Sequence, residues 1–371
     1  MCNKTILYYI VSLTVIKRKK GKTKVKEFFP WSTKVYQNSI KNYLNGQFSI
    51  LDIQLNGKCN YNCIYCDSPD RNLSSKIDFE HLENLILHQN GLYEWMFICG
   101  LGEPLWKENK DVLLHLLALC KRKKMKCTIF TNGSNIDDCI IEYVRSGILF
   151  PLIKIDSFSS ELAESLYGTS QAAKNLLAIQ ELFKVAKEFD DEYYHIAASI
   201  VPTSQNLQEI PSIVECCIKN NTFPLLGQLE YAGKAIGSYN DLLLSKNTLL
   251  KLKNQISKIC ETEYKVPICP SVIAGIHINN DGYVSVDSKS GLSCSWFWLE
   301  TPQTTNLCEI NTITSLTNAE KAILNYRKKT FDLLPIICFN TEQYPFGGCG
   351  GNIKDLLADY IKIQNKLFAE L

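Results

Sequence analysis

The 371-residue sequence predicts an α/β fold in which a (β/α)6 partial barrel is followed by a smaller, cysteine-rich α+β extension. Short apolar runs alternate with helical patterns from about residue 48 to 235, which is typical of a parallel sheet with crossover helices. After a further helical pattern at 245–260 the helical period largely stops, and residues 269–350 are rich in Gly, Pro, Asn, Ser, Cys and Trp. Six predicted strands favour a partial TIM barrel over the full eight-stranded form.

The first 47 residues are predicted to form an N-terminal hairpin and a helix. An apolar run of eleven residues, 6–16, precedes the basic stretch 17–20. A membrane helix needs about twenty apolar residues, and a secretory signal carries its positive charge before the apolar run. We therefore predict a β-hairpin with a basic turn over residues 5–29. We interpret this turn as solvated, with docking of an acidic partner as the alternative.

The barrel is expected to span residues 48–258. Strands are predicted where short apolar runs end in Gly, Pro, Asn or Ser, at 48–55, 95–99, 127–131, 152–156, 195–201 and 225–231. Helices are predicted at 79–89, 109–124, 136–146, 172–189, 206–219 and 245–260. In such folds the chemistry collects on the loops at the carboxyl ends of the strands.

Cysteine is the unusual feature of the composition. The chain has 16 cysteines among 371 residues, a fraction of about 4 %. Secreted disulfide scaffolds typically contain roughly 8–10 %. Clustered cysteines in a reduced compartment favour metal or redox chemistry instead. The net charge of +2 gives no indication of a nucleic-acid or membrane partner. Because clustered cysteines of this kind indicate a reduced compartment, we expect a cytoplasmic protein.

The sharpest motif follows the first predicted strand. Cys59, Cys63 and Cys66 have the spacing C-x3-C-x2-C, and thiolates are the usual ligands of iron–sulfur clusters. Three thiolates would leave one iron of a [4Fe-4S] cluster without a protein ligand, so that this iron could bind another molecule. A structural zinc site normally has four protein ligands, and no fourth Cys or His follows closely.

This motif, placed after the first strand, resembles the radical S-adenosylmethionine (SAM) superfamily. The resemblance implies that the open iron chelates the amino and carboxylate groups of SAM, and that Tyr65 packs near the adenine. A core aromatic is the alternative interpretation of Tyr65. The resemblance also implies an electron donor, such as a reductase, flavodoxin or ferredoxin. Reductive cleavage of SAM would then give a 5′-deoxyadenosyl radical that abstracts a hydrogen atom from the substrate.

Further positions at strand ends fit the same family. The cofactor-binding residues that the resemblance implies, besides Tyr65, are Gly100, Gly102, Glu103, Pro104, Asn132, Asp156 and Ser157. A strand-to-helix turn would explain the Gly-Glu-Pro element equally well, and helix capping would explain Asp156 or Ser157. We interpret Asn206 and Glu209 as a helix cap, with a contribution to the cofactor pocket as the alternative. Gln228 and Glu230 alternate on the sixth predicted strand and are candidate pocket residues.

Residues 259–371 are predicted to form the cysteine-rich extension. Asn280–Gly282 is typical of a hairpin turn. The cysteines around it resemble an incomplete SPASM/twitch domain, which carries auxiliary clusters. This resemblance implies one auxiliary [4Fe-4S] cluster on Cys269, Cys294, Cys338 and Cys349. Zinc on the same four cysteines, or a domain without metal, is the alternative.

The resemblance as a whole implies a radical SAM oxidoreductase or maturase. We expect its substrate to be a ribosomally made peptide, modified by crosslinking, epimerisation or oxidation. A small molecule such as a sugar or nucleoside is the alternative substrate. A non-catalytic iron–sulfur electron-transfer protein is the alternative of another class, and it would need a fully ligated cluster.

Overall fold

The computed structural model describes residues 26–45, 47–66, 74–88, 93–98, 102–229, 233–266, 269–271, 275–278, 283–285, 305–306, 318 and 346. Almost all of the predicted N-terminal hairpin therefore lies outside the described residues, as does the predicted turn at 280–282. The same holds for the candidate site residues Gly100, Glu230, Cys294, Cys338 and Cys349.

A nine-stranded sheet forms the centre of the molecule, in the order β11-β10-β9-β2-β3-β4-β5-β7-β8. Seven neighbouring strands run parallel: β9 (Gly275–Ile278), β2 (Ile50–Ile53), β3 (Trp95–Ile98), β4 (Lys126–Thr131), β5 (Leu149–Lys154), β7 (Ala197–Ile200) and β8 (Phe223–Leu226). Two short antiparallel strands, β10 (Tyr283–Ser285) and β11 (Thr305–Asn306), extend one edge. Because β8 and β11 stand at opposite ends of this order, the described sheet is open, and the predicted partial barrel is confirmed.

All six predicted strands are present, but two of them are shifted. Strand β5 starts at Leu149, three residues before the prediction, and it includes Pro151. Proline usually argues against an inner strand, yet here it precedes the first β5–β7 pair, which is Leu152 with Ala197. Strand β8 ends at Leu226 instead of residue 231. Gln228 therefore follows the strand and does not lie on it as predicted, whereas Glu230 lies outside the described residues.

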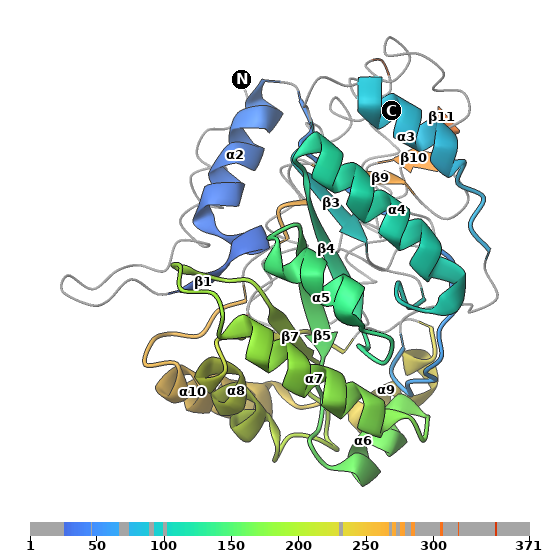
Figure 1. The fold of residues 1–371 in the computed structure, drawn as a ribbon. Helices are drawn as coiled ribbons and strands as arrows, with labels where there is room; N and C mark the ends of the chain where they lie inside the picture. The colour runs from blue at the N-terminus through green and yellow to red at the C-terminus, as the bar shows by residue number, and fades with distance from the viewer. Residues whose placement is uncertain are drawn as a thin grey trace, which may run out of the picture.

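Most helices cover the outer face of the sheet (Figure 1). These are α3 (Phe79–His88), α4 (Lys107–Lys123), α5 (Asp138–Arg145), α7 (Ala172–Ala186), α8 (Ile210–Lys219) and α10 (Lys246–Ile259). Two more helices, α6 (Ser160–Tyr167) and α9 (Ala235–Leu242), pack instead in a separate cluster with Tyr61, Cys63 and Tyr65. The buried residues of α4 include Leu113, Leu116, Leu117 and Cys120, a helical spacing that turns one apolar face to the core. Within the described residues, no helix is long and apolar enough to cross a membrane.

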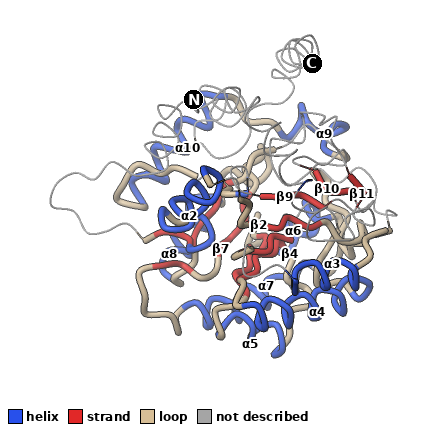
Figure 2. Tube along the Cα trace, turned by 90° about the horizontal axis from the view of Figure 1, so that it is seen from above, coloured by secondary structure: helices blue, strands red, loops and turns tan. Residues whose placement is uncertain are grey.

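An aromatic segment closes the amino end of the sheet. It consists of β1 (Glu27–Phe28), the 3-10 helix η1 (Phe29–Trp31) and α2 (Thr33–Leu44), and Figure 2 shows α2 and the outer helices around the central strands. Phe28 and Trp31 pack in one cluster with Ile50, Trp95 and Phe150, which lie at or near the first residues of their strands. This end is filled with side chains, so the opposite, carboxyl end is left for polar and functional groups.

Candidate functional site

The three motif cysteines lie on the loop that follows β2 at the carboxyl end of the sheet. Neighbouring backbone fixes this loop on two sides. The amide groups of Asn62 and Ile64 donate to the carbonyl oxygens of Tyr167 (2.8 Å) and Leu166 (3.0 Å) at the end of α6. From the other side, the Lys234 amide donates to the Cys66 carbonyl (2.9 Å). The cysteines are therefore held at defined positions by main-chain contacts.

The three thiols differ in their surroundings. Cys63 is buried, whereas Cys59 and Cys66 are partly exposed. The Tyr61 amide donates to Cys59 Sγ (3.3 Å), and Asn132 Nδ2 donates to the same sulfur (3.9 Å), and such donors favour a thiolate. Burial raises the pKa of Cys63 to about 12, and the nearby Lys154 charge acts in the opposite direction.

The donor set, three thiols on one loop, is of the kind that holds an iron–sulfur cluster. Within the described part of the chain, no three His, Cys, Asp or Glu side chains are arranged around one metal ion, as a mononuclear zinc site requires. In a cubane cluster each cysteine binds a different iron, so the three sulfurs need not converge on one point. A bound metal also displaces the proton that burial keeps on Cys63.

The turn after β3 packs directly on the chain that leads to the cysteine loop. Gly102 has φ +65°, and a side chain there would overlap the carbonyl oxygen of Asn56. Glu103 is buried and accepts three hydrogen bonds, from the Thr131 hydroxyl (2.5 Å), the Asn132 amide (2.7 Å) and the Leu105 amide (3.0 Å). Burial raises the pKa of Glu103 to about 7. The carboxylate thus ties this turn to the end of β4, and buried Pro104 is part of the same turn.

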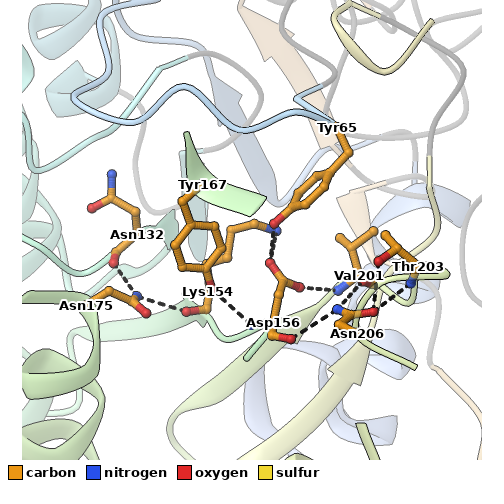
Figure 3. Close-up of polar contacts among 9 residues, drawn as sticks. All are labelled: Tyr65, Asn132, Lys154, Asp156, Tyr167, Asn175, Val201, Thr203 and Asn206. Atoms are coloured by element: carbon orange, nitrogen blue, oxygen red, sulfur yellow. Dashed lines mark hydrogen bonds and ion pairs between the residues drawn. The ribbon is translucent and has the colours of Figure 1, made fainter. Parts of the chain in front are cut away.

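Asp156 is the centre of a second network (Figure 3). Its Oδ2 accepts the hydroxyl hydrogen of Tyr65 and pairs with Lys154 Nζ at 3.0 Å. Its Oδ1 accepts from the Val201 amide (2.7 Å), and its own amide donates to the Tyr167 hydroxyl (2.9 Å). The fully buried carboxylate therefore connects the cysteine loop with the carboxyl ends of β5 and β7.

Helix capping, the alternative considered for Asp156 and Ser157, is wrong. The N-cap of α6 is Ser159, whose side chain accepts from the Leu162 amide. The Ser157 hydroxyl instead donates to Glu209 Oε2 at 2.8 Å.

The predicted helix cap at Asn206 and Glu209 is also wrong. Helix α8 begins at Ile210, four residues later than predicted, and no side-chain hydrogen bond caps it. Asn206 is 0 % exposed. Its Nδ2 donates to the carbonyl oxygens of Asp156 (3.1 Å) and Val201 (3.0 Å), while its Oδ1 accepts from the amide and hydroxyl of Thr203 (2.8 and 3.0 Å). Its place just after a strand end was the only signal in the sequence.

A second buried amide had no signal in the sequence, because it lies inside a helix. Asn175 of α7 donates through Nδ2 to the Asn132 carbonyl (2.6 Å) and to the Lys154 carbonyl (3.0 Å). It joins the ends of β4 and β5 (Figure 3). Asn60 of the cysteine loop also contacts the segment that follows β4, because its Nδ2 donates to the Ser134 hydroxyl at 2.7 Å.

Residues 53–213 match the model of the radical SAM superfamily. This chain carries a radical SAM domain. The matched region contains the cysteine loop, the Glu103 turn and the Asp156 network.

Two solved structures with bound S-adenosylmethionine have a similar fold. Streptococcus suis SuiB bound to S-adenosylmethionine has a TM-score of 0.54 and 16 % sequence identity, and the match covers 80 % of this chain and 71 % of that one. A structure of anSMEcpe with bound AdoMet and Cp18Cys peptide has a TM-score of 0.52 and 14 % identity, with 86 % and 99 % covered. At such identities the likeness shows the fold alone. Among curated proteins, none matches this chain.

The candidate auxiliary ligands lie beyond the match to the radical SAM domain. Cys269 is partly buried and packs against apolar residues of two core clusters. It is the one member of the predicted ligand set for which the structure describes a position, so the auxiliary cluster stays a prediction.

Proposed function

We propose that this chain is a radical SAM enzyme that holds a [4Fe-4S] cluster on Cys59, Cys63 and Cys66. When bound, the cluster would supply an electron that cleaves SAM to a 5′-deoxyadenosyl radical, and this radical would abstract a hydrogen atom from the substrate. The observation that carries the proposal is the position of the cysteine loop. Asn132 from the end of β4 contacts Cys59, and Asp156 beyond β5 contacts Tyr65.

The protein's own residues position and support the site. The donors to Cys59 Sγ favour its thiolate, and the main-chain contacts of Asn62, Ile64 and Cys66 keep the loop in place. Glu103 and Asp156 already accept hydrogen bonds from protein donors. We therefore assign both to positioning the segments that surround the cofactor site, without direct contact with the cofactor. Tyr65, Gly100, Gly102, Pro104, Asn132 and Ser157 remain the proposed neighbours of the cofactor.

We further propose a peptide substrate and a flavodoxin- or ferredoxin-type electron donor. One structure of similar fold, anSMEcpe, contains a bound peptide together with AdoMet. A reductive cleavage also needs an external electron, which small iron–sulfur or flavin proteins supply. A sugar or nucleoside is the alternative substrate, and product analysis by mass spectrometry with candidate peptides distinguishes the two.

The test of the central proposal is anaerobic reconstitution with iron and sulfide, followed by reduction in the presence of SAM. We expect the wild-type protein to form 5′-deoxyadenosine, and Cys63→Ala to lose both this product and the change in the cluster spectrum on addition of SAM, while an auxiliary cluster keeps its own signal. Cys139→Ala is the matched control, because Cys139 is an exposed cysteine on α5. A wild-type cluster whose spectrum ignores SAM, with no 5′-deoxyadenosine formed, would favour the electron-transfer class instead.

A further inference from the structure

Lys154 places a positive charge beside the cysteine loop. Its Nζ lies 4.6 Å from the centre of the Tyr65 ring and 3.0 Å from Asp156 Oδ2. Tyr65 directly precedes Cys66 and follows Cys63 by two residues. The Lys154 side chain is 20 % exposed, so water and salt screen its charge only partly.

Asp156 does not simply cancel this charge. Its carboxylate accepts hydrogen bonds from the Tyr65 hydroxyl and the Val201 amide in addition to its ion pair with Lys154. These donors stabilise the negative charge and orient the carboxylate. The ammonium lies over the ring face of Tyr65, where the ring quadrupole attracts a cation. Asp156 and Tyr65 together therefore hold the ammonium in one place.

A fixed cation next to a cluster affects its reduction. Reduction adds a negative charge to the cluster, and a positive charge nearby stabilises the reduced form more than the oxidised form. Net charge and hydrogen bonding are among the factors that set the potentials of iron–sulfur clusters.

We propose that Lys154 raises the reduction potential of the cluster on Cys59, Cys63 and Cys66, and that Asp156 is the positioning residue that fixes its ammonium. The inference rests on the proposed function. On this proposal, the Lys154–Asp156 pair determines how readily the electron donor reduces the cluster.

The test is a redox titration of the reconstituted cluster, followed by electron paramagnetic resonance in the absence of SAM. We expect Lys154→Gln to lower the ratio of reduced to oxidised cluster about tenfold at a fixed potential, which corresponds to about 59 mV for a one-electron couple. Lys154→Arg keeps the charge and should stay near the wild-type value. If Asp156 positions the ammonium, Lys154→Gln should lower the potential less in the Asp156→Asn background than in the wild-type background.

Iron and sulfide per chain are measured for every variant, and Lys126→Gln is the matched control. Lys126 begins β4 at the far end of the sheet, with its Nζ 3.9 Å from the Phe29 ring centre, so its loss changes the net charge equally without changing the potential. An unchanged Lys154→Gln potential overturns the inference, as does an equal shift in Lys126→Gln. If Lys154→Gln retains no cluster, Lys154→Met is measured in its place, and a potential equal to the wild-type value overturns the inference.

Failure of the inference differs from failure of the proposed function. If the wild-type loop binds no cluster, or the loaded protein cleaves no SAM, the proposed function is wrong. If the wild-type protein does both while Lys154→Gln leaves the potential unchanged, only the role of Lys154 is wrong.

Discussion

Gly102 fits its position because it has no side chain. Its φ of +65° lies in the left-handed region, and the backbone of residues 56–58 occupies the space where a Cβ would point. The obstacles are carbonyl groups of the main chain, among them the Lys58 oxygen at 2.6 Å, and main chain cannot rotate away as a side chain can. This one residue therefore fixes how closely the Glu103 turn approaches the cysteine loop.

We expect Gly102→Ala to destabilise the protein by about 2–5 kcal/mol, since the left-handed backbone costs about 1–2 kcal/mol and overpacking about 1–3 kcal/mol. Gly147→Ala is the control, because Gly147 has nearly the same φ, +66°, with nothing within 4 Å of its Cβ position. Chemical denaturation of both variants separates the two costs. Equal losses would mean that the close approach to Asn56 is unimportant.

Glu103 makes stability depend on pH. Its pKa is about 7 in the folded protein against an ordinary value of 4.5, so the folded state holds a proton that the unfolded state releases. Stability from this group is complete below pH 4.5 and falls as the pH rises to about 7. The predicted loss is about 3 kcal/mol, at 1.36 kcal/mol per pKa unit.

The measurement compares unfolding free energies of the wild type and Glu103→Gln between pH 4.5 and 7. Because Gln does not titrate, the stability of the wild type relative to this variant should fall across the range. Glu80→Gln, at an exposed position on α3, should show no such trend. If the difference in unfolding free energy between wild type and Glu103→Gln stays constant with pH, the side chain of Glu103 is not a buried carboxylic acid that keeps its proton up to about pH 7.

Elements could be predicted better than the contacts at their ends. Apolar periodicity depends on neighbours in the chain, so helices such as α4 and all barrel strands except β5 and β8 were predicted close to their observed bounds. The start of α8 was not, because Asn206 and Glu209 make hydrogen bonds to Asp156, Ser157 and Phe158. Those partners are about fifty residues away in the chain, and no local pattern contains them.

The aromatic segment at the amino end of the sheet gives a test at the level of elements. Phe28 is 1 % exposed and packs on Trp31 and Phe223, with ring centres 5.6 and 6.1 Å apart. We expect Phe28→Ala to lower the free energy of unfolding by about 3–5 kcal/mol, the usual cost of such a truncation. Leu177→Ala, at a site on α7 that is 63 % exposed, should change it little. Similar denaturation midpoints for the two variants would show that this segment is not required for barrel stability.

At the scale of the whole molecule, the cysteines differ in how far their role can be predicted from the sequence, and the structure shows why. The thiols of Cys120, Cys127 and Cys217 are fully buried in the apolar core, where cysteine behaves as a small hydrophobic residue. They come from three separate elements, α4, β4 and α8. The spacing of the motif cysteines predicts their site because all three ligands lie on one loop. An auxiliary site, by contrast, would draw its ligands from four separate segments.

Iron content can therefore locate any second cluster. In the triple variant Cys59→Ala, Cys63→Ala, Cys66→Ala, we expect about four irons per chain to remain after reconstitution, which is the content of one [4Fe-4S] cluster. Adding Cys269→Ala should remove them, whereas adding Cys120→Ala should not, because Cys120 is enclosed by the core. Iron that survives Cys269→Ala would contradict the proposed ligand set. An iron-free triple variant would show that the extension carries no cluster, since the motif loop alone would then account for all the iron.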